Sequence, residues 1–186
     1  MNGWAKKRKT MQRYDATAHL YDMRYSEEQT AKIQAALENI NIKGHSSVLD
    51  VGCGTGVLFQ YIVREAGNIV GLDISKMTLI HAKERTSSPN VHLVWADADS
   101  MPIKSNAFNY VFAITLLQNT PSPHNTLDEI KRVSQTDSIF VITGLKKCFS
   151  LGSFRTMLRE ADFKILELMD EYHLKCYVAV CAKLLH

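Results

Sequence analysis

A run of glycines and three aspartates are the residues of this 186-residue chain whose types and spacing could do chemistry. Gly52, Gly54 and Gly56 follow an apolar segment that ends at Val51, and Asp50 stands just before them. Glycine lets the backbone turn sharply and lets a ligand approach without meeting a Cβ atom. A glycine loop directly after a buried strand therefore predicts a ligand site at that end of the strand.

The spacing of these glycines argues against a dinucleotide site. The dinucleotide fingerprint is G-x-G-x-x-G/A, whereas Val57 stands at its third position and the third glycine is Gly56. Asp50 would repel a pyrophosphate but would attract a cationic ligand, directly or through water. An NAD-dependent oxidoreductase is therefore the less favoured interpretation, and a positively charged nucleoside is the favoured ligand.

Two further aspartates follow the next two strand-like segments. Asp73 ends the segment 68–73, and Asp97 lies near the end of the segment 91–98. A carboxylate at the tip of the neighbouring strand can accept hydrogen bonds from both ribose hydroxyls, which is the role expected of Asp73. Asp97 could accept a hydrogen bond from an adenine amino group. A single such acid is commonly a cap or turn residue, but three of them beside a glycine loop favour a binding site.

Strand-like and helical segments alternate along the chain, and this alternation must position the acids. Helices are expected at 26–40, 57–67, 76–86, 126–135 and 153–162, and strands at 46–52, 68–73, 91–98, 108–115, 138–144, 164–171 and 174–184. Crossover connections of this kind imply a largely parallel sheet covered on both faces. The last two strands have a short link, which favours an antiparallel hairpin. We expect a single doubly wound α/β domain with seven strands.

Composition excludes several classes of protein. Apolar residues make up 46% and charged residues 22%, which is typical of one globular domain and not of a disordered chain. The net charge of +3 is mildly basic. No apolar run is long enough to span a bilayer, and the N-terminus lacks the apolar stretch of a signal peptide. The four cysteines and seven histidines show no metal-ligand spacing, so we expect reduced thiols, no metal and a cytoplasmic protein.

These motifs together resemble the class I S-adenosylmethionine-dependent methyltransferases, in particular the small type 11 group. The resemblance covers about residues 14–184 and implies a Rossmann-like fold: 14–22 resembles the segment that folds over the cofactor, 50–56 the glycine motif and 73–77 the ribose motif. It implies a cofactor-binding domain over 14–186, preceded by a flexible basic arm at 1–13. The cofactor contacts that it implies are Tyr21, Asp50, Gly52, Cys53, Gly54, Asp73, Ile74, Met77 (under the adenine), Asp97, Ala98 and Thr115.

The chain departs from the family after the fourth expected strand. The family often has two histidines after a leucine, and here Gln118 and Asn119 follow Leu117. An amide oxygen can accept an N–H bond and aim a nitrogen lone pair at the methyl group, so we take these two amides as the candidate catalytic residues and a nitrogen as the acceptor atom. His19, Tyr21 and His124 are alternative proton acceptors for a hydroxyl nucleophile.

The acceptor is expected to be large, because the chain has little room for a lid beside the active face. The basic segments 6–9 and 146–147 could lie along phosphates, which favours RNA or a translation-associated protein. The third strand should lie at one edge of the sheet, where Val91, Leu93 and Trp95 make it apolar, and some small methyltransferases pair there with a small zinc-binding activator. A small-molecule methyltransferase and a non-catalytic cofactor-binding subunit remain as alternatives, and no membrane contact is expected.

Overall fold

A computed structural model describes residues 3–184 of the chain, without the side chains of residues 19–26. Its elements, in chain order, are α1 (Gly3–Leu37), β1 (Ser47–Val51), α2 (Phe59–Ile62), β2 (Asn68–Asp73), α3 (Lys76–Arg85), β3 (Val91–Trp95), β4 (Phe108–Ala113), the 3₁₀ turn η1 (Leu117–Asn119), α4 (Pro123–Val133), β5 (Ser134–Leu145), α5 (Leu151–Glu160), β6 (Phe163–Met169) and β7 (Cys176–Lys183).

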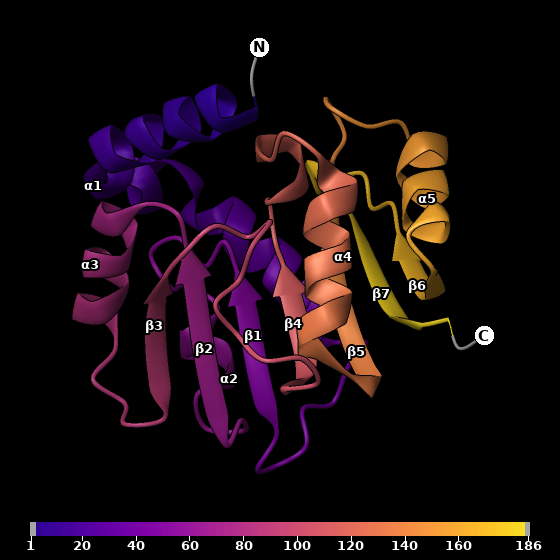
Figure 1. Cartoon of the computed structure of the whole chain (residues 1–186), viewed down its shortest axis with the longest axis horizontal. Coiled ribbons are helices and arrows are strands. Elements are labelled where there is room, and N and C mark those ends of the chain that lie inside the picture. The colour runs from indigo at the N-terminus through magenta and orange to yellow at the C-terminus, as the bar shows by residue number, and fades with distance from the viewer. Residues whose placement is uncertain (1–2, 185–186) are drawn as a thin grey trace.

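The strands form one seven-stranded sheet in the order β3-β2-β1-β4-β5-β7-β6 (Figure 1). The pairs from β3 to β5 are parallel, and β7 lies antiparallel between β5 and β6. The expected doubly wound sheet and its C-terminal antiparallel hairpin are therefore confirmed. The third strand is an edge strand, as expected.

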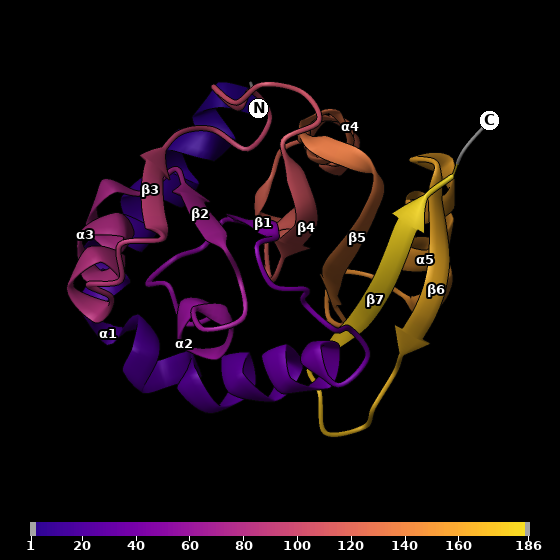
Figure 2. The ribbon, with the colours of Figure 1, turned by 90° about the horizontal axis from the view of Figure 1, so that it is seen from below.

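Helices cover both faces of this sheet (Figure 2). The last part of α1 packs with α2 and α3 on one face, where Ile33, Phe59 and Leu79 join a buried apolar cluster. α4 and α5 cover the other face through a second cluster that includes Ile130 and Phe154. β1 is buried on both sides, which is why it reads as a continuous apolar run in the sequence.

Two helices differ from the sequence-based expectation. The helix expected at 26–40 is the last part of a longer helix, α1, which also takes in residues 3–13, the segment expected to be a mobile arm. The helix expected at 57–67 keeps α geometry only in α2. The amides of Phe59 and Glu65 donate to carbonyls three residues back, so a tighter turn lies on each side of α2.

The strand order reverses between β1 and β4, and open α/β sheets bind ligands at such a point. The loops that follow β1, β2, β3 and β4 all leave the sheet at this edge. The first part of α1 crosses above it (Figure 1). Within the part of the chain that the structure describes, no helix is both long and apolar enough to cross a bilayer.

Candidate cofactor and acceptor site

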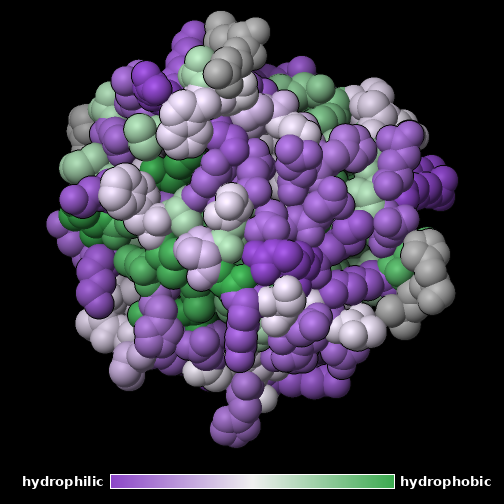
Figure 3. Space-filling model, in the orientation of Figure 1, coloured by the Kyte–Doolittle hydropathy of each residue, from purple (hydrophilic) through white to green (hydrophobic). Residues whose placement is uncertain are grey.

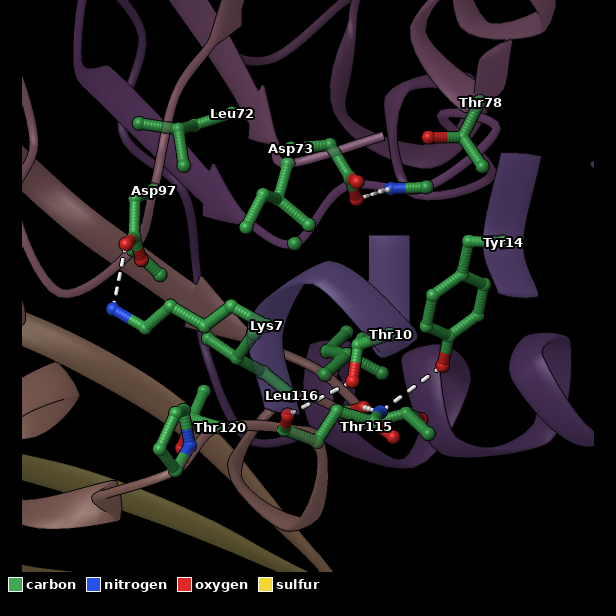
Figure 4. Close-up of a pocket in the computed structure, with 17 residues that line it drawn as sticks. Lys7, Thr10, Tyr14, Leu72, Asp73, Thr78, Asp97, Thr115, Leu116 and Thr120 are labelled. Atoms are coloured by element: carbon green, nitrogen blue, oxygen red, sulfur yellow. Dashed lines mark hydrogen bonds and ion pairs between the residues drawn. The ribbon is translucent and has the colours of Figure 1, made fainter. Parts of the chain in front are cut away.

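A cavity lies between the carboxyl ends of the strands and the first part of α1 (Figure 4). Its walls carry most of the residues that the sequence analysis assigned to a nucleoside. The expected residues that line it are Gly52, Gly54, Asp73, Ile74, Asp97, Ala98, Thr115 and Asn119. We call this cavity the nucleoside pocket. The fold thus brings together residues from four different strand ends.

Asp73 is the most highly bonded acid of the nucleoside pocket. Its Oδ2 atom accepts a hydrogen bond from Gly54 N at 2.9 Å, and its Oδ1 atom accepts one from Ser75 N at 2.8 Å. Burial raises the pKa of Asp73 above its usual 3.8, and these backbone bonds oppose the rise. Each carboxylate oxygen can accept more than one bond, so Asp73 keeps capacity for a pair of hydroxyls.

Two glycines of the loop are needed for different reasons, one for space beside the ligand site and the other for packing. Gly54 has a φ of +54°, and a Cβ atom built on it would meet no heavy atom within 4 Å. A Cβ atom on Gly56 (φ +75°) would lie 2.7 Å from the ring of Phe59. Gly54 therefore keeps space open beside the cavity, whereas Gly56 allows the loop to pack on α2.

A second, smaller cavity of about 40 Å³ lies between the glycine loop and α1. It shares Gly52 and Gly54 with the nucleoside pocket, and the predicted contacts Asp50 and Cys53 line it. Burial, with the nearby charge of Asp73, raises the pKa of Asp50 to about 8. No hydrogen bond or ion pair reaches the Asp50 carboxylate from the described residues, so its position suits a ligand cation.

The first part of α1 is tied to the strand ends by polar contacts that the sequence analysis did not foresee. Lys7 Nζ lies 2.6 Å from Asp97 Oδ2 (Figure 4) and also 2.6 Å from Asp99 Oδ2. Burial would lower the pKa of Lys7, but its bonds to these two acids raise it above its usual value. Farther along the helix, Asp15 Oδ1 accepts from Ser75 Oγ at 2.6 Å. The acid expected to bind the adenine amino group is therefore engaged by a lysine.

The nucleoside pocket is too small for a nucleoside while α1 stands in this position. Its volume is about 80 Å³, whereas sites for small ligands measure roughly 300–1,000 Å³. Lys7, Thr10 and Tyr14 form the wall on the α1 side. The first part of α1 must therefore move outwards when a ligand of that size binds, and the ion pairs of Lys7 must open.

Lys7→Met is expected to raise the affinity for S-adenosylmethionine roughly tenfold. The two ion pairs that compete with the ligand are partly exposed and contribute up to about 1 kcal/mol each, and 1.4 kcal/mol is a factor of ten. Titration calorimetry measures the change. Lys6→Met is the matched control, because among the described residues Lys6 Nζ donates to the carbonyl oxygen of Thr120 alone. A loss of affinity in Lys7→Met would mean that Lys7 holds the ligand.

Thr115 lies where the nucleoside pocket meets a further cavity, and its backbone is strained. Its φ is +61°, a region that β-branched residues rarely adopt. Thr143 Oγ1 accepts from its amide at 2.7 Å, and Lys32 Nζ donates to its hydroxyl at 2.9 Å. Lys32 is only 1% exposed and also pairs with Glu28 Oε1 at 3.0 Å. This buried lysine was not expected to be near the site, and it helps to fix Thr115.

A third cavity of about 710 Å³ opens on the other side of this junction. Tyr14, Thr115 and Asn119 line both this cavity and the nucleoside pocket. The other lining residues are Arg13, Thr17, Glu28, Gln29, Gln118, Leu145, Lys146, Lys147, Cys148 and Lys175. We call it the basin. A molecule in the basin would lie next to the end of the nucleoside pocket.

The two candidate catalytic amides have different hydrogen-bond partners in the structure. Asn119 Nδ2 donates to Tyr14 Oη at 3.0 Å and to Thr115 O at 2.9 Å, and Asn119 Oδ1 accepts from Arg13 Nη2 at 2.9 Å. Gln118 Nε2 donates to Thr115 O at 2.7 Å, but the buried Gln118 Oε1 has no donor among the described residues. Asn119 is thus fully engaged within the chain, whereas Gln118 keeps one buried acceptor that is unpaired among the described residues.

Several other expected residues do not join these cavities. Met77 is 41% exposed and lines none of them, although its amide donates to Asp15 Oδ1 at 3.2 Å. His124 is exposed in the first turn of α4. The side chains of His19 and Tyr21 lie outside the described residues. Elsewhere in the described part, no group of three or more His, Cys, Asp or Glu side chains is arranged to hold a metal ion.

Comparison with known sequences gives a family. The family described as "Methyltransferase domain" matches residues 49–142. An uncharacterized protein of Methanocaldococcus jannaschii is 32% identical over 130 residues, which are 70% of this chain and 49% of that protein. A demethylmenaquinone methyltransferase of Staphylococcus saprophyticus is 33% identical over 109 residues, or 56% of this chain and 47% of that enzyme. The chain spans about half the length of these curated relatives.

Solved structures agree with the fold. A chain of the complex between the Haloferax volcanii Trm112 methyltransferase activator and a methyltransferase superposes with a TM-score of 0.78 at 17% identity, covering 91% of this chain and 97% of that chain. The glycine loop and the acids at the ends of β1, β2 and β3 lie within the region that the family matches. The chain therefore belongs to the methyltransferase-domain family of class I S-adenosylmethionine-dependent methyltransferases.

Proposed function

We propose that the protein transfers a methyl group from S-adenosylmethionine to a nitrogen atom of a large acceptor that enters the basin. The observation that carries this proposal is the meeting of two cavities at Thr115, Tyr14 and Asn119. One cavity is rimmed by acids and suits a cationic nucleoside. The other is open and large enough to admit part of a macromolecule.

The residues present fit the cofactor. Asp73 has free acceptor capacity for ribose hydroxyls, Gly54 leaves space at the loop, and Asp50 lacks a cationic partner within the described chain. S-adenosylmethionine supplies an electrophilic methyl group when it is bound, so the protein contributes mainly by holding the acceptor in line. In this role Gln118 Oε1 accepts an N–H of the acceptor. Asn119 positions the wall through Arg13 and Tyr14.

Transfer of labelled methyl from S-adenosylmethionine into the RNA, protein and small-molecule fractions of a cell extract tests the proposal. Label is expected in a macromolecular fraction. Gln118→Met should lower turnover about 10–100-fold without weakening the binding of S-adenosylmethionine. It removes a hydrogen bond to the reacting nitrogen, which contributes about 1.5–3 kcal/mol as that nitrogen gains positive charge. His124→Ala is the control and should transfer normally. Unchanged turnover in Gln118→Met would remove Gln118 from the reaction.

The same transfer experiment, together with two binding measurements, separates the alternatives. Label confined to the small-molecule fraction favours a small-molecule methyltransferase. Binding of S-adenosylmethionine without formation of S-adenosylhomocysteine favours a non-catalytic subunit. A stronger thermal shift with NAD than with S-adenosylmethionine would favour the oxidoreductase.

We also propose that a small activator protein covers β3. Among the strands that the structure describes, this edge strand pairs with β2 alone, and Trp95 at its end is 62% exposed. No helix lies between β3 and β4, so Val70 and Val94 on the α4 side of the sheet are only partly buried, and apolar surface gathers over this part of the molecule (Figure 3). Trp95 Nε1 donates to Ile74 O at 2.9 Å, so a partner there would touch the wall of the nucleoside pocket.

The complex that contains Trm112 supports this choice of partner, since its chain has the same fold. Co-expression with a Trm112-type protein is expected to yield a stable complex, and Trp95→Glu should abolish co-purification because it places a charge on the exposed edge. Leu166→Glu, on the opposite edge strand β6 and 47% exposed, is the matched control. Equal co-purification of both variants would count against pairing at β3.

A further inference from the structure

We infer that the basin binds the phosphate backbone of an RNA acceptor, a proposal that rests on the proposed methyl transfer and names its substrate class. The side chains that line the basin include four cations and one carboxylate. The cations are Arg13, Lys146, Lys147 and Lys175, and the carboxylate is Glu28. They come from α1, from the loop after β5 and from the turn before β7.

The positive charge of the basin is only partly neutralised. Lys146 Nζ pairs with Asp170 Oδ1 at 2.7 Å. Glu28 serves two lysines, because Lys32 Nζ lies 3.0 Å from its Oε1 atom and Lys175 Nζ lies 3.3 Å from its Oε2 atom. Burial would raise the pKa of Glu28, but these lysines lower it below its usual value, so Glu28 stays ionised. Five cations thus face two carboxylates in this set.

Two of these cations make no ion pair with a described carboxylate, and a third, Lys175, keeps its side chain 72% exposed beside Glu28. Within the described part of the chain, Lys147 is exposed and has no ion-pair partner. Arg13 is exposed and makes no ion pair with a described carboxylate; its guanidinium lies 4.8 Å from the centre of the Tyr14 ring and donates to Asn119 Oδ1. An ordered guanidinium plane beside an aromatic ring is a surface on which unpaired bases stack. An RNA strand uses both features, whereas an acidic peptide uses only the charge.

The basin is also connected to the point of transfer. Asn119 holds Arg13 on one side and Tyr14 and Thr115 on the other, so a base near Arg13 lies beside the junction with the nucleoside pocket. Gln118 lines the same wall, and its unpaired Oε1 atom is buried within that wall. Exocyclic amino groups and ring N–H groups of RNA bases are donors for such an oxygen. The arrangement therefore holds phosphates at the rim and offers an acceptor for a base nitrogen inside.

Binding of a labelled single-stranded oligoribonucleotide, followed by fluorescence anisotropy over a salt series, tests the inference. The double variant Lys147→Glu/Lys175→Glu is expected to bind at least tenfold more weakly. Its salt dependence should fall by about 0.7 in log–log slope for each phosphate contact that is lost. The matched control is Lys104→Glu/Lys164→Glu, which makes the same change in net charge at exposed lysines near the amino ends of β4 and β6.

Cys148 gives a second readout that reports on the basin itself. It is exposed there, whereas Cys53, Cys176 and Cys181 are buried. RNA is expected to slow alkylation of Cys148 by a thiol reagent, and polyglutamate or inorganic phosphate at the same ionic strength is not. Equal protection by polyglutamate would assign the basin to acidic protein instead.

Two outcomes overturn the RNA inference without touching methyl transfer. The first is equal RNA affinity of the Lys147→Glu/Lys175→Glu variant and its control. The second is labelled methyl that appears in protein and not in RNA while S-adenosylmethionine still binds. A failure of the proposed function would look different, because S-adenosylmethionine would then not bind or no label would be transferred to any fraction.

Discussion

Gly54→Ala is expected to weaken S-adenosylmethionine binding about 100-fold while the protein still folds. The Cβ atom would project into open space beside the nucleoside pocket, where the ligand must approach the backbone. Overpacking of about 3 kcal/mol against the ligand corresponds to two powers of ten in affinity. The folded state itself should lose only about 1–2 kcal/mol, which is the strain of alanine at a positive φ. Titration calorimetry and thermal unfolding measure the two effects.

Gly56→Ala is the matched control in the same loop. It should lower the stability of the folded protein strongly and change the affinity for S-adenosylmethionine little. Its Cβ atom would lie 2.7 Å from the ring of Phe59 and 3.2 Å from the Cβ atom of Ala82. Strain and overpacking together predict a loss of roughly 2–5 kcal/mol of unfolding free energy. If both variants lost stability equally and kept their affinity, the open side of Gly54 would not be a ligand surface.

The parts of the site that sequence reasoning found are those encoded by local motifs. Gly52, Gly54 and Asp73 lie within a few residues of strand ends, and a parallel sheet brings such ends to one edge whatever the loops do. The largely parallel sheet followed from the alternation of segments, and the edge position of β3 followed from the family resemblance. The antiparallel hairpin followed from the short link before β7.

The parts that it missed depend on contacts between distant segments. Residues 3–13 have no apolar period, so nothing in them predicts a helix over the nucleoside pocket; Lys7 meets Asp97 only because the sheet edge lies beneath it. Lys32 stands among apolar residues on a helix, where a lysine is expected to face solvent. Its burial is explained by Glu28 and Thr115, and Thr115 lies more than eighty positions away in the sequence.

The Asn119 amide illustrates a different limit. The sequence places Gln118 and Asn119 after β4, but it does not distinguish the two amides from each other. The structure distinguishes them because Arg13 and Tyr14, on α1, take up the Asn119 side chain. Such a distinction depends on side-chain partners and cannot be read from spacing.

Asp50→Asn is expected to stabilise the ligand-free protein at alkaline pH and to weaken the binding of S-adenosylmethionine. Burial and the charge of Asp73 raise the pKa of Asp50 from 3.8 to about 8. Between these values the folded chain holds a proton that the unfolded chain has released, so the unfolding free energy falls as the pH rises. The fall amounts to as much as about 1.4 kcal/mol per pH unit and ends above pH 8.

Asparagine keeps the shape and removes this titration. The difference in unfolding free energy between Asp50→Asn and the natural chain should therefore be small near pH 4 and grow with pH, up to a ceiling of about 6 kcal/mol above pH 8. Denaturant unfolding at a series of pH values measures this difference. The neighbouring thiol of Cys53 does not confuse the result, because burial raises its pKa well above 9 and it stays protonated.

Ligand binding should show the opposite sign, and this contrast makes the prediction specific. A cation beside Asp50 favours the ionised carboxylate, so binding at neutral pH should release up to one proton, and the affinity should rise with pH until about pH 8. Calorimetry in buffers of different ionisation enthalpy counts that proton. Asp50→Asn should release none and bind about 10–100-fold more weakly, the effect of about 1.5–3 kcal/mol from a lost charged contact. Proton release that persists in the variant would show that Asp50 does not face the sulfonium or ammonium group.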